Sequence, residues 1–124
     1  MMLHRYLAAS VIVASGLLGC LSAAAADYLA DAERLTAIGE LRAAEIQLEN
    51  AVKADPGNLE AHYRLGDLKL RLDDAAGAER EARIAREQDY DPARVVPLLA
   101  RAYLAQGKFR LIIYEFSPTE GGPE

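Results

Sequence analysis

The sequence of 124 residues contains one cysteine, no tryptophan, two phenylalanines and no excess of basic residues. A single cysteine excludes an internal disulfide framework and a multi-cysteine zinc or iron–sulfur site. The 14 basic residues face 19 acidic ones, so the net charge is −5, which argues against nucleic-acid binding. This length allows one domain or part of a repeat array. Because large aromatic residues are few, the core has to be built from small side chains that pack closely.

The sequence also lacks the residue combinations on which catalysis depends. After the N-terminal segment it holds one histidine, His62, without a Ser–His–Asp arrangement or a glycine-rich phosphate loop. We expect His62, at a helix start, to lie in the core or at its rim. The adjacent Asp73 and Asp74 also precede a helix, where carboxylates act as caps more often than as metal ligands. We therefore predict that the chain is not an enzyme and holds no metal ion or cofactor.

The first twenty residues are typical of a secretory signal. A short start with Arg5 precedes an uncharged apolar run over residues 6–18, which ends in small residues. Leu17-Leu18-Gly19-Cys20 resembles the bacterial lipobox. The resemblance implies cleavage before Cys20 and a lipid on its thiol, with residues 1–19 as signal peptide and 20–26 as a lipidated spacer. It places the protein on a membrane, facing the periplasm, and Leu21 after the cysteine favours the outer membrane.

Two other interpretations of this segment stay open. The apolar run continues to Ala26, so an uncleaved segment is long enough to span a bilayer. Ordinary cleavage after the alanines at positions 23–26 would instead release a protein without lipid.

Small residues recur at an interval of 34 positions beyond the signal. Ala32, Gly66 and Ala100 are spaced in this way, as are Ala44 and Ala78. This period is typical of repeats made of two helices. The segments 62–66, 103–109 and 51–56 resemble parts of the tetratricopeptide (TPR) repeat. The resemblance implies an all-α solenoid of helical hairpins with about two and a half repeats, at 25–58, 59–92 and, incomplete, 93–116.

Apolar periodicity and capping residues predict six helices. Leu41, Ala44 and Leu48 follow a helical stripe. Asn58 and Asp91, like the two aspartates before residue 75, offer side-chain oxygens to the free N–H groups of a helix start. Pro97 lies inside one of these segments, so that helix is expected to start later or to bend. The predicted helices are 27–37, 40–54, 59–72, 75–88, 92–105 and 108–116.

The C-terminal segment raises a separate question. Residues 110–116 are unusually apolar and β-branched, so a strand is the alternative to a helix there, and residues 117–124 are predicted to be a disordered tail. No further helix follows to cover Ile113 and Phe116, although solenoids need a polar terminal cap. We expect either a partner at this end or a longer array of which the chain is the opening part, and we favour the longer array.

The TPR resemblance also implies an interaction surface, because the first helices of such repeats line a groove that holds a partner peptide or helix. We expect Arg64, Arg71 and Arg101 to form a positive patch for the carboxylates of a partner, with Tyr63 and Leu70 in apolar contact. The alternative is that these arginines only pair with Glu60, Asp67 and Asp74. The groove positions carried over from the family are Leu29, Glu33, Thr36, Tyr63, Arg64, Asp67, Leu70, Arg71, Leu98, Arg101 and Leu104.

A narrower resemblance points to one biological system. The lipobox, residues 41–48 and residues 90–101 are similar to the N-terminal part of the TPR-repeat lipoprotein of the PEP-CTERM/exosortase system. This implies a protein–protein scaffold in the cell envelope, active in PEP-CTERM protein sorting and exopolysaccharide export. The alternatives are a generic outer-membrane assembly or peptidoglycan-associated TPR lipoprotein, and an accessory domain of an envelope enzyme.

Overall fold

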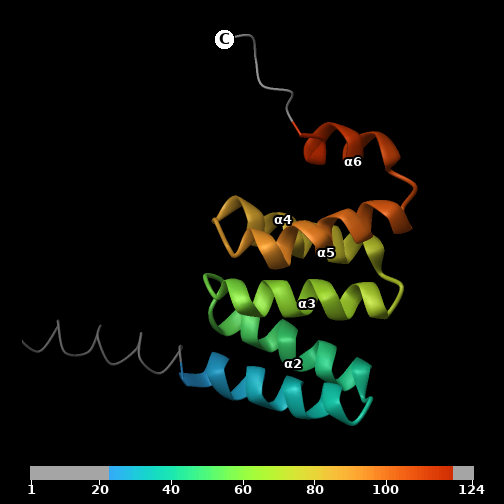
Figure 1. The fold of residues 1–124 in the computed structure, drawn as a ribbon. Helices are drawn as coiled ribbons and strands as arrows, with labels where there is room; N and C mark the ends of the chain where they lie inside the picture. Colours follow the sequence, from blue (N-terminus) through green and yellow to red (C-terminus); the bar gives the residue numbers. More distant parts are fainter. Residues whose placement is uncertain (1–22, 119–124) are drawn as a thin grey trace, which may run out of the picture. The chain divides into compact units, whose positions relative to one another are not determined.

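The computed structural model describes residues 23–118, which consist of helices joined by short turns, without a strand among them (Figure 1). This confirms the prediction of an all-α chain. Cys20 and the tail beyond residue 118 lie outside the described residues. The first helix covers residues 23–37, and it is followed by α2 (Leu41–Ala54), α3 (Leu59–Arg71), α4 (Ala75–Glu87), α5 (Pro92–Ala105) and α6 (Phe109–Phe116).

The first helix begins earlier than predicted. It includes the alanines at positions 23–26, which were assigned to a spacer. Alanine has the highest intrinsic helix propensity, and Ala25 is buried with only 1% of its surface exposed. These alanines therefore extend the helix.

The predicted caps are confirmed. Asn58 Oδ1 accepts a hydrogen bond from the Ala61 N–H at 3.1 Å, and Asp74 Oδ1 accepts one from the Gly77 N–H at 2.9 Å. Asp91 accepts from the Ala93 N–H at 3.0 Å, with Pro92 at the first helical position. Each side chain satisfies a backbone donor that has no partner within its own helix.

Four of the described helices are followed by a residue with a left-handed backbone conformation. Gly39 (φ 82°) follows the first helix and Gly107 (φ 71°) follows α5, while Asp73 (φ 64°) and Asp89 (φ 60°) take this conformation after α3 and α4. Glycine adopts it without steric cost, and aspartate tolerates it better than most residues. The chain thus reverses direction within a few residues at each of these turns.

Pro97 does not interrupt its helix. α5 runs unbroken from Pro92 to Ala105, so the expected later start is wrong, and the alternative of a bend stays a prediction. Proline removes the N–H that would bond to the carbonyl of Ala93, but Ala93 and Pro97 both lie on the exposed side of the helix. The opposite side of α5, with Val95, Leu98 and others, is buried and holds the helix in place.

The C-terminal segment is helical, so the alternative of a strand is wrong. In α6 the less exposed residues are Leu111, Ile112, Glu115 and Phe116. Their spacing places them on one side of a helix, and Glu115 and Phe116 are joined to α4 and α5 by contacts described below.

The chain divides into two compact units, residues 1–61 and 62–124, with the boundary inside α3. In the first unit the buried side chains are mainly alanines, such as Ala32, Ala44 and Ala51, together with Leu48. In the second unit α4 packs against α5, and α5 against α6. The core of the second unit consists of Ala82, Ala85, Val95, Leu98, Leu99 and Tyr103.

One small residue permits a close approach within the second unit. A Cβ atom built on Gly66 of α3 would lie 3.1 Å from Leu98 Cδ2, 3.3 Å from the carbonyl oxygen of Ala78 and 3.3 Å from Glu81 Cβ. These distances show that α3 lies against both α4 and α5 at this glycine. Gly66 therefore faces Ala78, whereas Ala100, the equivalent position in α5, is only half-buried.

Candidate functional site

The exposed sides of α3 and α5 form one continuous face. The Arg101 guanidinium lies 2.8 Å from the Asp67 carboxylate, although the two residues are 34 positions apart. Nearer the start of both helices, the Arg94 guanidinium lies 4.2 Å from the centroid of the Tyr63 ring. Since residue numbers rise together along both helices from one contact to the next, α3 and α5 run parallel. We call the α3–α5 face the surface formed by Tyr63, Arg64, Asp67, Leu70, Arg71, Arg94, Arg101 and Leu104.

One end of the α3–α5 face is aromatic and cationic. The rings of Tyr63 and Tyr90 are 5.7 Å apart between centroids. The Arg94 guanidinium lies over both rings and donates a hydrogen bond to the Tyr90 hydroxyl. Cation–π contacts at exposed sites contribute about 0.5–1 kcal/mol. The sequence reasoning found Tyr63 but missed its two partners, although Arg94 lies one helical turn before Leu98 on the same side of α5.

The middle and the far end of the face differ in polarity. The Asp67–Arg101 pair supports the alternative that the arginines pair with acidic neighbours, but it joins two helices rather than two turns of one helix. Arg64 is half-buried and has a contact within the chain. At the end of α3 Arg71 is exposed, and no ion pair is found for it among the described residues; Leu104 is 54% exposed.

Leu98 does not line a groove, so this prediction is wrong. The side chain is fully buried and belongs to the core of the second unit. Gly66 has no side chain and leaves room for Leu98, whose Cδ2 would lie only 3.1 Å from a Cβ atom built on that glycine. The Leu70 side chain is partly buried, because it packs against the same core.

The three groove positions predicted on the first helix lie in the first compact unit. Leu29 is half-buried and Glu33 is exposed. The hydroxyl of Thr36 donates a 2.7 Å hydrogen bond to the carbonyl of Ala32, one turn earlier in the same helix. The α3–α5 face is accordingly defined by residues of the second unit.

His62 lies in the core, as expected. It is 4% exposed, and its Nδ1 lies 2.8 Å from Oε2 of Glu81, which is 7% exposed. Lys69, also buried, lies 3.8 Å from the Asp74 carboxylate. Buried polar groups need such partners, because an unpaired buried charge is costly. These pairs therefore account for polar residues in the interior of an otherwise alanine-rich and leucine-rich fold.

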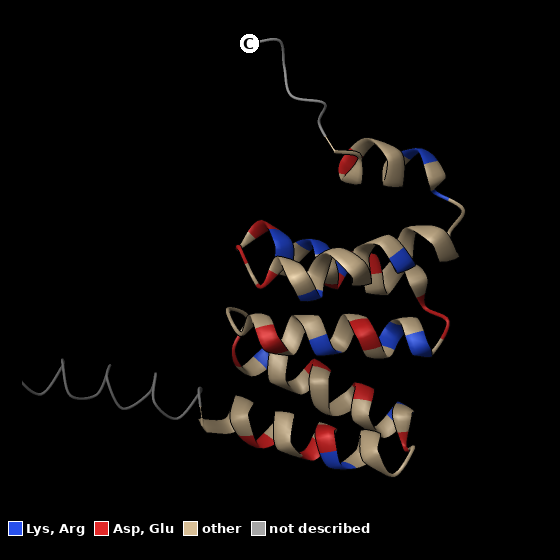
Figure 2. Cartoon of the chain, viewed as in Figure 1, with Lys and Arg blue, Asp and Glu red and all other residues tan. Residues whose placement is uncertain are grey.

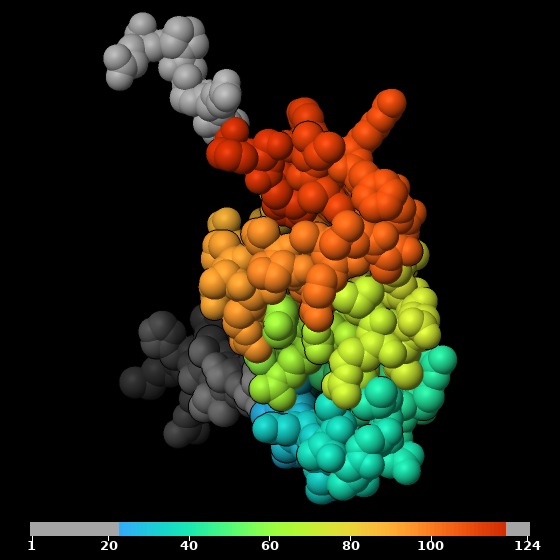
Figure 3. Space-filling view, turned by 45° about the vertical axis from the view of Figure 1, so that its right-hand side comes forward, coloured from blue at the N-terminus to red at the C-terminus, as the bar shows by residue number. Residues whose placement is uncertain are grey.

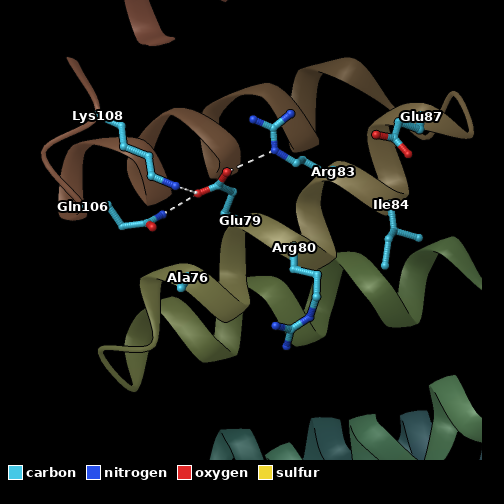
Figure 4. Close-up of a pocket in the computed structure, with 8 residues that line it drawn as sticks. All are labelled: Ala76, Glu79, Arg80, Arg83, Ile84, Glu87, Gln106 and Lys108. Atoms are coloured by element: carbon cyan, nitrogen blue, oxygen red, sulfur yellow. Dashed lines mark hydrogen bonds and ion pairs between the residues drawn. The ribbon is translucent and has the colours of Figure 1, made fainter. Parts of the chain in front are cut away.

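An open pocket of about 410 Å³ lies beside α4 and the turn between α5 and α6 (Figure 4). At its centre Glu79 accepts hydrogen bonds from Lys108 at 2.6 Å, Gln106 at 2.7 Å and Arg83 at 3.1 Å. Burial raises the pKa of Glu79, but these hydrogen bonds outweigh burial and bring the pKa below its ordinary value. The central carboxylate is thus already satisfied by the protein. The residues that line the pocket are Ala76, Glu79, Arg80, Arg83, Ile84, Glu87, Gln106 and Lys108.

A second polar cluster attaches α6 to the rest of its unit. The Tyr103 hydroxyl donates to Glu115 Oε1 at 2.9 Å, Arg86 donates to Oε2 at 2.5 Å, and Arg83 lies 3.5 Å away. Burial raises the pKa of Glu115, but the hydrogen bonds from Tyr103 and Arg86 outweigh burial. The pKa of Glu115 therefore lies below its ordinary value. Burial and the bond to Glu115 raise the pKa of Tyr103 to about 12. Sequence reasoning did not foresee this cluster.

Neither a metal-binding cluster nor a membrane-spanning helix is found within residues 23–118. Within residues 23–118 no group of three His, Cys, Asp or Glu side chains is arranged to hold a metal ion. In the same part of the chain no helix combines the length and the apolar character needed to cross a membrane. Comparisons with protein-family models, curated proteins and solved structures find no match to this chain.

Proposed function

We propose that the protein is a TPR-like scaffold that binds a segment of a partner protein along the α3–α5 face. The observation that supports this most is the Asp67–Arg101 ion pair. It joins positions 34 residues apart on parallel helices, as expected for equivalent positions of two consecutive helical repeats. Stacked repeats of this kind present an extended surface built from corresponding side chains, which suits an elongated ligand better than a small molecule.

The chemistry of the face favours a partner segment with carboxylates and apolar side chains. Arg71 is exposed, and Arg101 retains 54% side-chain exposure beside Asp67. Guanidinium groups bind carboxylates through two parallel hydrogen bonds. Tyr63 and Leu104 offer apolar surface at the two ends of the face. An acidic peptide would thus meet local positive charge on a protein whose net charge is −5.

The proposal also includes a place in the cell. The lipobox supports a lipid on Cys20 that tethers the protein to a membrane of the envelope, most simply the outer membrane, with its helices in the periplasm. Residues 41–48 and 90–101 support a role in PEP-CTERM protein sorting and exopolysaccharide export. One alternative function is that of a generic outer-membrane assembly or peptidoglycan-associated TPR lipoprotein, which only the lipobox and the 34-residue period support. The other is that of an accessory domain of an envelope enzyme, which would bind its partner through the same face.

Photo-crosslinking in cells tests the binding face. A benzoylphenylalanine residue at position 104, on the face, is compared with one at position 46 on α2, because Leu104 and Ile46 have similar exposures of 54% and 57%. We expect a discrete crosslinked protein for position 104 and not for position 46, and we expect Arg71→Glu to reduce it. Equal crosslinking at the two positions would refute the assignment of the face.

Metabolic labelling tests the tether. We expect incorporation of labelled palmitate into the protein and its loss in Cys20→Ala. If the label persists in Cys20→Ala, lipidation at that residue is excluded, whereas the binding face is unaffected by this outcome.

A further inference from the structure

The outer side of α6 carries a row of exposed apolar residues. Phe109 is 60% exposed, Ile113 is 67% exposed and Tyr114 is 86% exposed. Arg110 is exposed on the same side, and Glu115 is turned inward to Arg86 and the Tyr103 hydroxyl. We call the residues Phe109, Arg110, Ile113 and Tyr114 the α6 stripe. α6 lies at the surface of its unit, and Arg110 and Glu115 are its charged residues (Figures 2 and 3).

Two of the corresponding positions of α4, Ala75 and Glu79, are bonded to the next hairpin, while Ala76 and Arg80 are exposed. α4 begins at Ala75 and α6 begins at Phe109, 34 positions later. In α4 the carbonyl of Ala75 and the carboxylate of Glu79 receive hydrogen bonds from Gln106, at the end of the following helix, and Lys108 also binds Glu79. The residues 34 positions after Ala75 and Glu79 are Phe109 and Ile113. Where α4 has a polar contact with the next hairpin, α6 therefore has apolar side chains.

The size of the α6 stripe fits a modest protein interface. A large aromatic side chain offers about 200 Å² of surface, so the stripe exposes roughly 400 Å² of apolar area. This lies within the range of the largest patch on a monomer, roughly 300–600 Å², which is often functional. Two stripes in contact would bury roughly 800–1,000 Å², including the Arg110 stems, which is typical of a weak dimer rather than a permanent one.

We propose that the α6 stripe is a dimer interface, in which a second copy of the chain packs its own stripe in antiparallel orientation. The stripe has no acidic side chain, so two chains of net charge −5 can meet there without bringing carboxylates together. In a two-fold arrangement the same patch must complement itself. Antiparallel pairing places Arg110 of each copy beside the Tyr114 ring of the other and brings the two Ile113 side chains close to the axis.

Disulfide trapping tests this geometry on the full chain in mild detergent. The background is Cys20→Ala, because Cys20 is the one native cysteine. We compare Ile113→Cys with Ile46→Cys, since residues 113 and 46 have similar exposures of 67% and 57%. We expect Ile113→Cys to form a covalent dimer under mild oxidation at least about tenfold faster than Ile46→Cys. Equal rates would overturn the proposal.

Sedimentation velocity gives the second readout. In the Cys20→Ala background we expect the mass to double as concentration rises, with a midpoint on the order of 10–100 μM. Ile113→Glu and Tyr114→Lys should each remain monomeric with unchanged helical circular dichroism, while Ile46→Glu should dimerise like the parent. A monomer at every concentration, a dimer that survives Ile113→Glu, or binding of the stripe to lipid vesicles without dimerisation would overturn the proposal.

Discussion

Two leucines of α5 show how far the role of a residue depends on a few ångströms of packing. Leu98 and Leu104 were both predicted to line a groove, yet Leu98 is fully buried and Leu104 is 54% exposed. The two side chains lie six positions apart and so face different sides of the helix, and Gly66 leaves space for Leu98 in the core. The same substitution at the two positions should therefore affect different properties of the protein.

We expect Leu98→Ala to lower the free energy of unfolding by about 2–5 kcal/mol, because it leaves a cavity among Val95, Leu99 and Tyr103. Leu104→Ala should change it by less than about 1 kcal/mol and should reduce partner binding instead. Urea unfolding followed by circular dichroism measures both. A large loss of stability in Leu104→Ala would contradict the assignment of that side chain to the face.

The raised pKa of Tyr103 leads us to predict that the folded protein loses stability in alkali. Its pKa is raised to about 12 in the folded protein, chiefly by burial and by the bond to Glu115, whereas the unfolded value is about 10. A raised pKa stabilises the fold fully below pH 10, and this contribution disappears as the pH rises towards 12. It amounts to at most about 3 kcal/mol.

We therefore expect the free energy of unfolding to fall between pH 10 and about 12. Tyr103→Phe should be less stable at neutral pH, because Glu115 loses a donor, and should show a smaller decline in that interval. Tyr114→Phe is the matched control, since Tyr114 is 86% exposed. Identical declines in the two variants would contradict the role given to burial of the Tyr103 hydroxyl.

At the scale of the helix, α6 depends on few attachments. It contains eight residues, and none of them is fully buried. The Glu115 cluster joins it to α4 and α5, and the Arg86 guanidinium lies 5.5 Å from the centroid of the Phe116 ring. A short helix with little buried surface is expected to open locally before the rest of its unit.

Glu115→Gln should loosen α6 selectively. We expect hydrogen exchange of the α6 amides to accelerate at least about tenfold, because hydrogen bonds to a charged group contribute about 1.5–3 kcal/mol, while α4 and α5 stay protected. The pKa of Glu115 is lowered in the folded protein, so its contribution is present above the ordinary carboxyl pKa and is lost as the pH falls through the folded value. Lowering the pH should thus reduce the protection factors of the α6 amides, which compare measured with intrinsic exchange rates, more in the parent than in Glu115→Gln. Equal acceleration in all helices would contradict a local attachment.

At the scale of the whole molecule, the sequence predicts local features well and distant contacts poorly. Asn58, Asp74 and Asp91 act as caps because a cap bonds to a backbone donor two or three residues ahead, within reach of pattern reasoning. The contacts of Glu115 with Arg86 and of Gln106 with Glu79 span 29 and 27 positions. Such pairs depend on how helices rotate against one another, which the apolar period leaves open.

The same limit applies to the candidate site. The 34-residue period placed Asp67 and Arg101 at equivalent positions, and the structure shows them in contact. The period did not indicate that Tyr90 and Arg94 close one end of the face, because they belong to a turn and to the first part of a helix. Nor did it show which leucine of α5 would be buried.

Fluorescence polarisation of labelled peptides tests the central claim, a partner-binding α3–α5 face, most directly. The full chain in detergent is titrated into a peptide that alternates glutamate with leucine, and into a control peptide with lysine in place of glutamate. We expect the glutamate peptide to bind at least about tenfold more tightly, and we expect Arg71→Glu with Arg101→Glu to abolish this preference. Arg42→Glu, on α2 with 75% side-chain exposure, should retain it. Equal affinity for the two peptides, or a preference that survives the double substitution, would contradict the claim.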